Sequence, residues 1–104
     1  MRRWTRFPDG TLIQAGRISQ SAAMQTAIGG NHPNLFRTAN SLAESFEVPF
    51  IGAPFVTVTP RAQVNFAYMD GAPTATGFRV WPLGMVSAAA SNRIIDYVAI
   101  GRWR

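Results

Sequence analysis

The sequence contains no cysteine and no lysine, and only one histidine and five acidic residues among its 104. The lack of cysteine excludes disulfides and cysteine-ligated metal. Small secreted domains usually carry disulfide bridges, so this lack favours assembly in a reducing cytoplasm. No stretch approaches the roughly 20 consecutive apolar residues of a membrane span. The basic segment 1–8 lacks the apolar core of a signal peptide. We therefore expect neither a cleaved leader nor membrane insertion.

The few acids and bases leave little material for catalysis. Asp9 and Asp70 precede glycines, which is typical of turns. Glu44 and Glu47 lie three apart and would face opposite sides of a strand, unlike a glycosidase carboxylate pair. His32 lies in a Gly-Gly-Asn-His-Pro-Asn segment and is interpreted as a loop residue, the alternative being a metal site shared by symmetry-related copies. No phosphate loop, dinucleotide fingerprint or HExxH motif is present. We expect no enzyme, no cofactor and no metal.

All ten basic residues are arginines, and the net charge is +5. A pI near 11.4 raises nucleic acid as a partner. Five of the arginines lie close to the two ends, however, and the others are scattered. No cluster of stacking aromatics interleaved with basic residues is visible in the sequence. We interpret the arginines as solvated surface charge, with an anionic glycan or a protein as the next partner, and expect no nucleic acid.

Short alternating segments separated by turn residues predict β-strands. Two strands, Trp4–Phe7 and Leu12–Ala15, are expected on the two sides of the Pro8-Asp9-Gly10 turn. Four more are expected later in the chain: Phe55–Thr59, Val64–Met69, Phe78–Trp81 and Ile94–Trp103. The last of these is apolar on both faces, which predicts a central strand or one between the core and a subunit interface. Strands at this spacing favour an antiparallel sandwich or barrel.

Other segments carry weaker signals. The sequence does not decide between helix and loop for residues 17–40, where Ser19–Ile28 is the best helical stretch. Ser87–Ser91 is expected to be a loop.

Five phenylalanines are expected in the core: Phe46, Phe50, Phe55, Phe66 and Phe78. We expect one domain over residues 1–104, with an N-terminal hairpin at 1–16 and a sandwich core at 41–104.

Four segments, taken in order, resemble the C-terminal receptor-binding tips of bacteriophage tail fibres. These segments are Trp4–Gly16 with its Leu-Ile-Gln-x-Gly, Phe46–Val58 with its Phe-x-x-Pro-Phe-x-x-x-Pro-x-Val, Thr76–Val80, and the terminal Ile94–Trp103. The same strand order is similar to that of the H-type lectin domains. The resemblance implies a homotrimeric antiparallel β-sandwich of six to seven strands that binds sugars such as N-acetylgalactosamine. It also implies a place in the virion, at the tail fibre or tail tip, with a host surface glycan and other virion tail proteins as partners.

Sugar recognition needs an aromatic ring for the C–H face and planar polar groups for the hydroxyls. The candidates are one set of side chains on or beside two predicted strands: Arg61, Asn65, Tyr68, Asp70, Arg79, Trp81, Asn92 and Arg93. Tyr68 and Trp81 have an alternative role as packing residues, and Asp70 as a turn residue. Two other functions stay open: a structural virion or baseplate component without its own ligand, and a nucleic-acid-binding barrel.

Overall fold

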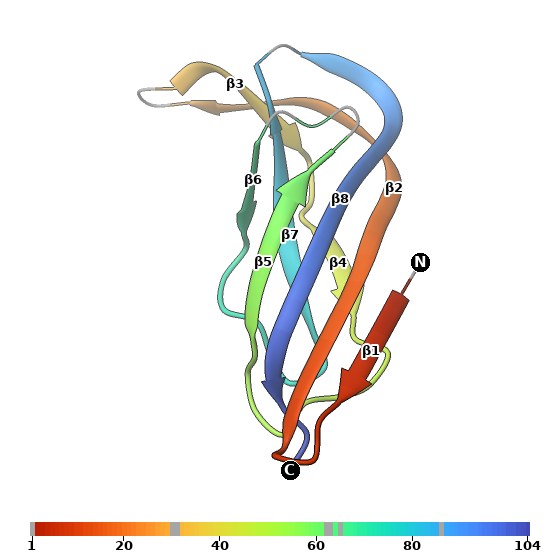
Figure 1. Cartoon of the computed structure of the whole chain (residues 1–104). Coiled ribbons are helices and arrows are strands. Elements are labelled where there is room, and N and C mark those ends of the chain that lie inside the picture. The colour runs from red at the N-terminus through yellow and green to blue at the C-terminus, as the bar shows by residue number, and fades with distance from the viewer. Residues whose placement is uncertain (1, 30–31, 62–63, 65, 86) are drawn as a thin grey trace.

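The computed structural model describes residues 2–29, 32–61, 64, 66–85 and 87–104, and every regular element within them is a β-strand. The eight strands of this part of the chain form one antiparallel sheet (Figure 1). They are Arg2–Arg6 (β1), Thr11–Gly29 (β2), His32–Thr38 (β3), Leu42–Ser45 (β4), Phe55–Pro60 (β5), Phe66–Met69 (β6), Gly77–Gly84 (β7) and Ala88–Arg102 (β8). The predicted all-β antiparallel class is confirmed. In the described ranges no helix is long and apolar enough to cross a membrane.

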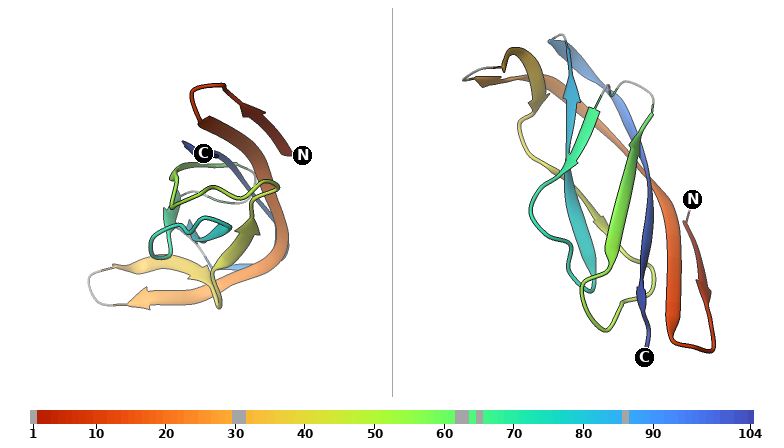
Figure 2. Two further views of the ribbon diagram at one scale, coloured as in Figure 1. Left: turned by 90° about the horizontal axis from the view of Figure 1, so that it is seen from below. Right: turned by 60° about the vertical axis from the view of Figure 1, so that its left-hand side comes forward.

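The sheet folds over into two layers, which gives the molecule a sandwich-like form (Figures 1 and 2). Strands β1, β2, β8 and β5 lie side by side in one layer. Strands β6, β7 and β4 form the other. The long strand β2 pairs with β8 as far as Met24 and then with β3, with register shifts at Met24/Thr26 and Ala27/Gly29. Such irregularities bend a strand, so β2 and β3 carry the sheet from one layer to the other.

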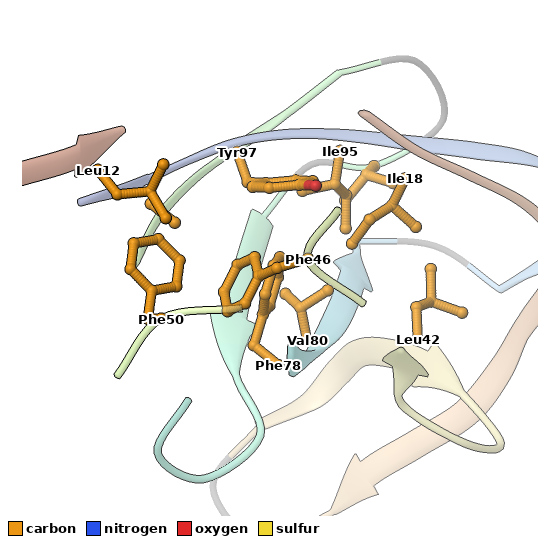
Figure 3. Close-up of a cluster of buried hydrophobic side chains, with 11 residues drawn as sticks. Leu12, Ile18, Leu42, Phe46, Phe50, Phe78, Val80, Ile95 and Tyr97 are labelled. Atoms are coloured by element: carbon orange, nitrogen blue, oxygen red, sulfur yellow. The ribbon is translucent and has the colours of Figure 1, made fainter. Parts of the chain in front are cut away.

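Alternate side chains of the facing strands fill the space between the layers (Figure 3). Strand β8 contributes Ile95, Tyr97 and Ala99, all buried, while its intervening residues Val98 and Ile100 are exposed. Strand β8 lies between β2 and β5, so the first of the two predicted alternatives, a central strand, is confirmed. The other buried members of the cluster are Leu12, Ile18, Leu42, Phe46, Phe50, Val64, Phe78 and Val80.

A buried amide ties the segment between β4 and β5 to this core. The Gln14 side chain donates from Nε2 to the Val48 carbonyl oxygen and accepts the Val48 backbone N–H at 3.1 Å. The Phe46 and Phe50 rings on either side of Val48 meet edge to face, with centroids 5.0 Å apart. A segment without regular structure is thus fixed by satisfied backbone groups and by aromatic packing.

Two of the five phenylalanines expected in the core lie on the surface instead. Phe55 is 86% exposed, and Phe66 is 50% exposed. Phe55 is paired in register with Ile100, and Phe66 with Leu83, on the outward faces of their layers. An alternating apolar segment predicts a strand, but not which of its faces meets the core. The prediction was wrong for these two residues and correct for Phe46, Phe50 and Phe78.

Most of the region left open between helix and loop lies in strands, since β2 extends to Gly29 and β3 covers His32–Thr38. In β2, Ser19, Gln20 and Ser21 pair in register with Ile94, Arg93 and Asn92 of β8. Backbone hydrogen bonds hold these strands together, so the side chains at these positions can be small or polar. The sequence therefore lacks the apolar alternation that would have predicted a strand. The expected loop at Ser87–Ser91 is also wrong from Ala88 onwards, where β8 begins. Strands β3 and β4 bring the count in the described residues to eight rather than six or seven.

Two turns form as predicted, each with a glycine at positive φ. Gly10 has φ 98° and Gly71 has φ 76°, conformations that only glycine adopts readily. At the first turn, the Asp9 carboxylate accepts the Thr11 backbone N–H at 2.9 Å. At the second, the Asp70 backbone N–H donates to the Arg79 carbonyl oxygen at 2.9 Å. The second turn therefore holds Asp70 directly beside β7.

Candidate functional site

Four of the predicted site residues come together on the outward face of β6 and β7. Tyr68 is opposite Trp81 in the register of these strands, and directly opposite residues share a face. Two residues further along, Asp70 lies beside Arg79. The inward residues of β7, Phe78 and Val80, are buried in the core. We name the group Tyr68, Asp70, Arg79 and Trp81 the β6–β7 face.

The Arg79 guanidinium is held in one orientation by Ser41. Its Nε donates to the Ser41 hydroxyl at 2.6 Å and its Nη2 donates to the Ser41 carbonyl oxygen at 2.8 Å. The nearest carboxylate oxygen of Asp70 lies 3.9 Å from Nε, a loose and solvent-exposed ion pair. These contacts leave other guanidinium N–H donors for a ligand, since the group carries five.

A hollow of about 290 Å³ lies beside this arginine. Its rim carries carboxylate, hydroxyl and guanidinium groups, contributed by Asp70, Thr74, Thr76 and Arg79. Strand β4 and the turn that follows β6 form its two sides, and Gly77 and Phe78 form part of its floor. Small binding sites combine a hollow with a few oriented polar groups. The arrangement suits a small ligand rich in hydroxyl groups.

Trp81 does not present a free ring to this hollow. The guanidinium carbon of Arg37, in β3, lies 4.3 Å from the centroid of the indole ring. Tyr68 is 42% exposed, so the tyrosine is the ring of this face that a ligand can reach. Arg37 is a residue that the sequence analysis missed. No local pattern identifies it, because the pairing of β3 with β7 brings it to Trp81.

The remaining predicted site residues lie elsewhere. Asn92 exchanges hydrogen bonds with Ser19 on the other layer, at 2.8 and 3.1 Å. Arg61 binds Asp96, also on that layer, at 2.7 Å. Arg93 is only 1% exposed and donates to the carbonyl oxygens of Ala22 and Ala89. Asn65 lies outside the described residues. The structure therefore does not bring Asn92, Arg61 and Arg93 to the β6–β7 face.

Asp96 is the centre of an ion-pair network on the layer of β2, β8 and β5. Its two carboxylate oxygens accept from the Nε atoms of Arg17 and Arg61, each at 2.7 Å. The hydrogen bond from Arg17 is the main cause that holds the pKa of Asp96 below its ordinary value, and the bond from Arg61 acts in the same direction. Arg61 is thus occupied within the protein, which gives it a structural role.

Metal ligands do not gather in the described part of the chain: no three His, Cys, Asp or Glu side chains there could hold an ion together. His32 begins β3. Neither a scan against protein-family models nor searches of curated proteins and of solved structures found a match for this chain. The resemblance to tail-fibre tips stays a prediction from the sequence.

Proposed function

We propose that this protein is a carbohydrate-binding module that attaches to a host cell-surface glycan, as the receptor-binding tip of a phage or phage-derived tail fibre. The observation that carries the proposal is the hollow that Asp70 and Arg79 help to line, with the exposed Tyr68 on the same outward face of β6 and β7. The order of the tail-fibre-like segments in the sequence supports the phage context.

The chemistry of the β6–β7 face fits a sugar. A carboxylate accepts, and a guanidinium donates, the hydrogen bonds that neighbouring hydroxyls can make. Because Ser41 already orients Arg79, little side-chain entropy is lost on binding. The Tyr68 ring offers an apolar surface to sugar C–H groups. A guanidinium also pairs with carboxylate or phosphate, so acidic sugars fit the same site.

The proposal includes a homotrimer of H-type lectin kind. The outward face of β8 and β5 exposes apolar side chains, among them Val98, Ile100 and Phe55. Exposed apolar patches commonly mark interfaces. Three copies of a weak sugar site on one particle would bind a dense glycan surface far more tightly than one copy.

A glycan array tests the proposal. We expect wild-type protein to bind a restricted set of glycans, and Arg79→Gln and Tyr68→Ala to lose this binding while their circular dichroism spectra stay those of a β protein. Arg61→Gln is the matched control, because it removes one arginine that is bound to Asp96 on the other layer. An array without signal, or a signal unchanged in both site variants, would reject the proposal.

The exposed apolar side chains of β5 and β8 also favour a second candidate, a structural virion or baseplate component without its own ligand. In that case Phe55 and Ile100 contact another virion protein rather than a second copy of this chain. This candidate predicts a silent array and a tight protein partner, whereas the first predicts glycan binding by the purified chain alone.

A further inference from the structure

Strand β6 carries a second exposed ring beyond that of Tyr68. Phe66 is exposed like Tyr68, whereas the residues that alternate with them, Ala67 and Met69, pack against the core. Alternate residues of a strand share a face, so both rings point outward. We name Phe66 and Tyr68 the β6 ring pair.

The β6 ring pair and the hollow lie in one row along the outward face. Phe66, Tyr68 and Asp70 occupy every second position of the chain, and Asp70 borders the hollow. Two residues of an extended strand span about 6.5 Å, a step that neighbouring units of a sugar chain can bridge. A ligand chain with one unit in the hollow can therefore continue over Tyr68 to Phe66.

Uncommitted hydrogen-bond donors lie beside the ring pair. The Arg37 guanidinium carbon lies 4.3 Å from the centroid of the Trp81 ring, and Trp81 is opposite Tyr68. The described residues contain one buried side-chain nitrogen or oxygen without a hydrogen-bond partner, the Arg37 Nε atom. The terminal nitrogens of this side chain have no partner in the described part of the chain either, and they therefore reach solvent. Their N–H groups are available to the hydroxyls of a ligand.

The chemistry of this face differs from that of the other exposed apolar face. On β5 and β8, Phe55 is accompanied by the aliphatic side chains of Val98 and Ile100, an apolar patch of the kind that marks a protein interface. On β6 the rings are accompanied by the guanidinium groups of Arg37 and Arg79. A sugar chain uses both features, since its C–H groups pack on rings and its hydroxyls form hydrogen bonds. The face therefore fits a glycan better than a protein.

We infer that the ligand is a chain of at least three sugar units that lies along β6, with one unit in the hollow, the second on Tyr68 and the third on Phe66. The inference rests on the proposed function and deepens it, because it names a polymeric glycan rather than a single terminal sugar as the ligand class. Arg37 donates hydrogen bonds to the two outer units.

The dependence of affinity on chain length tests the inference. The glycan array should carry homologous series of one to four units, made from glucose, rhamnose, N-acetylglucosamine and glucuronic acid. Each series that binds is then titrated against the wild-type chain by isothermal titration calorimetry, which reports on every site by itself. We expect the affinity to rise by up to about tenfold with the second unit and again with the third, because each meets one ring, and to change by less than about twofold with the fourth.

Variants of Phe66 test the place of the third unit. Phe66→Ala should remove the gain from the third unit and leave the affinity for the single unit within about twofold of wild type. Phe66→Tyr should keep the gain, because the ring remains. Phe55→Ala is the matched control, since it removes an exposed phenylalanine from the other layer and should leave every affinity unchanged.

Chemical-shift mapping locates the chain on the protein. The three-unit member of a binding series should shift the amide signal of Phe66, and the single unit should not. Affinity that does not rise from one unit to three, or a gain that Phe66→Ala keeps, would overturn the inference and leave the proposed function standing on the hollow alone. A lower mass of Phe66→Ala in light scattering would also overturn it, because the ring would then belong to a contact between subunits. An array without signal rejects the proposed function and the inference together.

Discussion

The Arg37 guanidinium carbon lies 4.3 Å from the centre of the Trp81 ring and joins β3 to β7 where the sheet turns from one layer to the other. The Arg37 Nε atom is buried and has no hydrogen-bond partner in the described residues. A cation over an indole ring is worth roughly 0.5–2 kcal/mol. Trp81 therefore serves the junction between β3 and β7, and Tyr68 is the ring that we propose to face the ligand.

Replacing Tyr68 and Trp81 in separate variants tests whether Tyr68 contacts the ligand and Trp81 stabilises the fold. Tyr68→Ala should weaken glycan binding by about tenfold, the upper end of what one aromatic contact supplies. Trp81→Phe should leave glycan binding within about threefold, but should lower the free energy of unfolding by about 1 kcal/mol. Titration with an array-positive glycan and urea unfolding measure the two effects. The reverse pattern would make Trp81 the ligand platform.

Replacement of Arg79 by lysine tests the orientation of the guanidinium. Lysine keeps the charge but loses the planar fork that reaches the hydroxyl and carbonyl oxygens of Ser41 together. We expect Arg79→Lys to lose about tenfold or more in glycan affinity, while the free energy of unfolding changes by less than about 1 kcal/mol. Wild-type affinity in this variant would show that only the charge at this position matters.

Asp96 makes stability depend on pH. Its pKa is lowered in the folded chain, first by Arg17. The resulting stabilisation is therefore present above the ordinary value of about 3.8 and is lost as the pH falls through the lowered value. Asp96→Asn should lower the free energy of unfolding at pH 7 by no more than about 1 kcal/mol, because both arginine partners are exposed.

The difference between wild type and Asp96→Asn should be constant above about pH 5 and should shrink below the ordinary pKa. Urea unfolding at several pH values measures it. A difference that grows as the pH falls would contradict the assigned direction of the pKa shift.

Gly77 tests the link between strand pairing and the hollow. A Cβ at this position would meet the Glu44 carbonyl oxygen well inside contact distance, and the Ser45 Cα at 3.3 Å. Because these are backbone atoms, β4 would have to move away from β7. We expect Gly77→Ala to lower the free energy of unfolding by about 1–3 kcal/mol. The variant should also weaken glycan binding, since Gly77 and its neighbours Glu44 and Ser45 in β4 all border the hollow. Gly52→Ala is the control, because its Cβ meets nothing within 4 Å.

Phe55 tests the proposed trimer interface. Its side chain is almost wholly exposed, so Phe55→Ser should change the stability of the isolated chain by no more than about 0.5 kcal/mol. Light scattering should nevertheless show that the mass falls from that of three chains to that of one. Phe66→Ser, on the outward face of the other layer, should leave the mass unchanged. A wild-type mass of a single chain would remove the trimer from the proposal.

The strands that the sequence predicts well are those with β-branched and aromatic residues between turn signals. The terminal strand is one of them, but both of its faces are apolar, so the sequence does not tell that Ile95, Tyr97 and Ala99 form the buried face. The second half of β2 has no such pattern, because its pairing with β8 rests on backbone hydrogen bonds between residues such as Ser19 and Ile94. Phe55 shows the converse limit, since a strong strand signal gives no information on which face is covered.

The sequence predicts those residues of the candidate site that local strand pairing brings together, and it misses contacts between distant segments. Tyr68 belongs to β6, Asp70 to the turn that follows it, and Arg79 and Trp81 to β7, so local pairing brings them together. Arg93 and Arg61 are distant in the fold and have partners of their own in Ala22 and Asp96. The contacts of Arg37 with Trp81 and of Arg6 with Trp103 join segments far apart in the chain, which periodicity and turn signals do not report.

The most direct test of the central claim is a ¹H–¹⁵N chemical-shift titration of the wild-type chain with a panel of neutral, N-acetylated and acidic monosaccharides. At least one sugar should shift amide signals of Asp70, Thr74, Thr76 and Arg79 together, because these residues share the rim of one hollow. Signals of Asp96 and Arg17, on the other layer, should stay in place. If no sugar in the panel moves the rim signals, or if the shifts gather on β8 and β5, the sugar site is not where we place it.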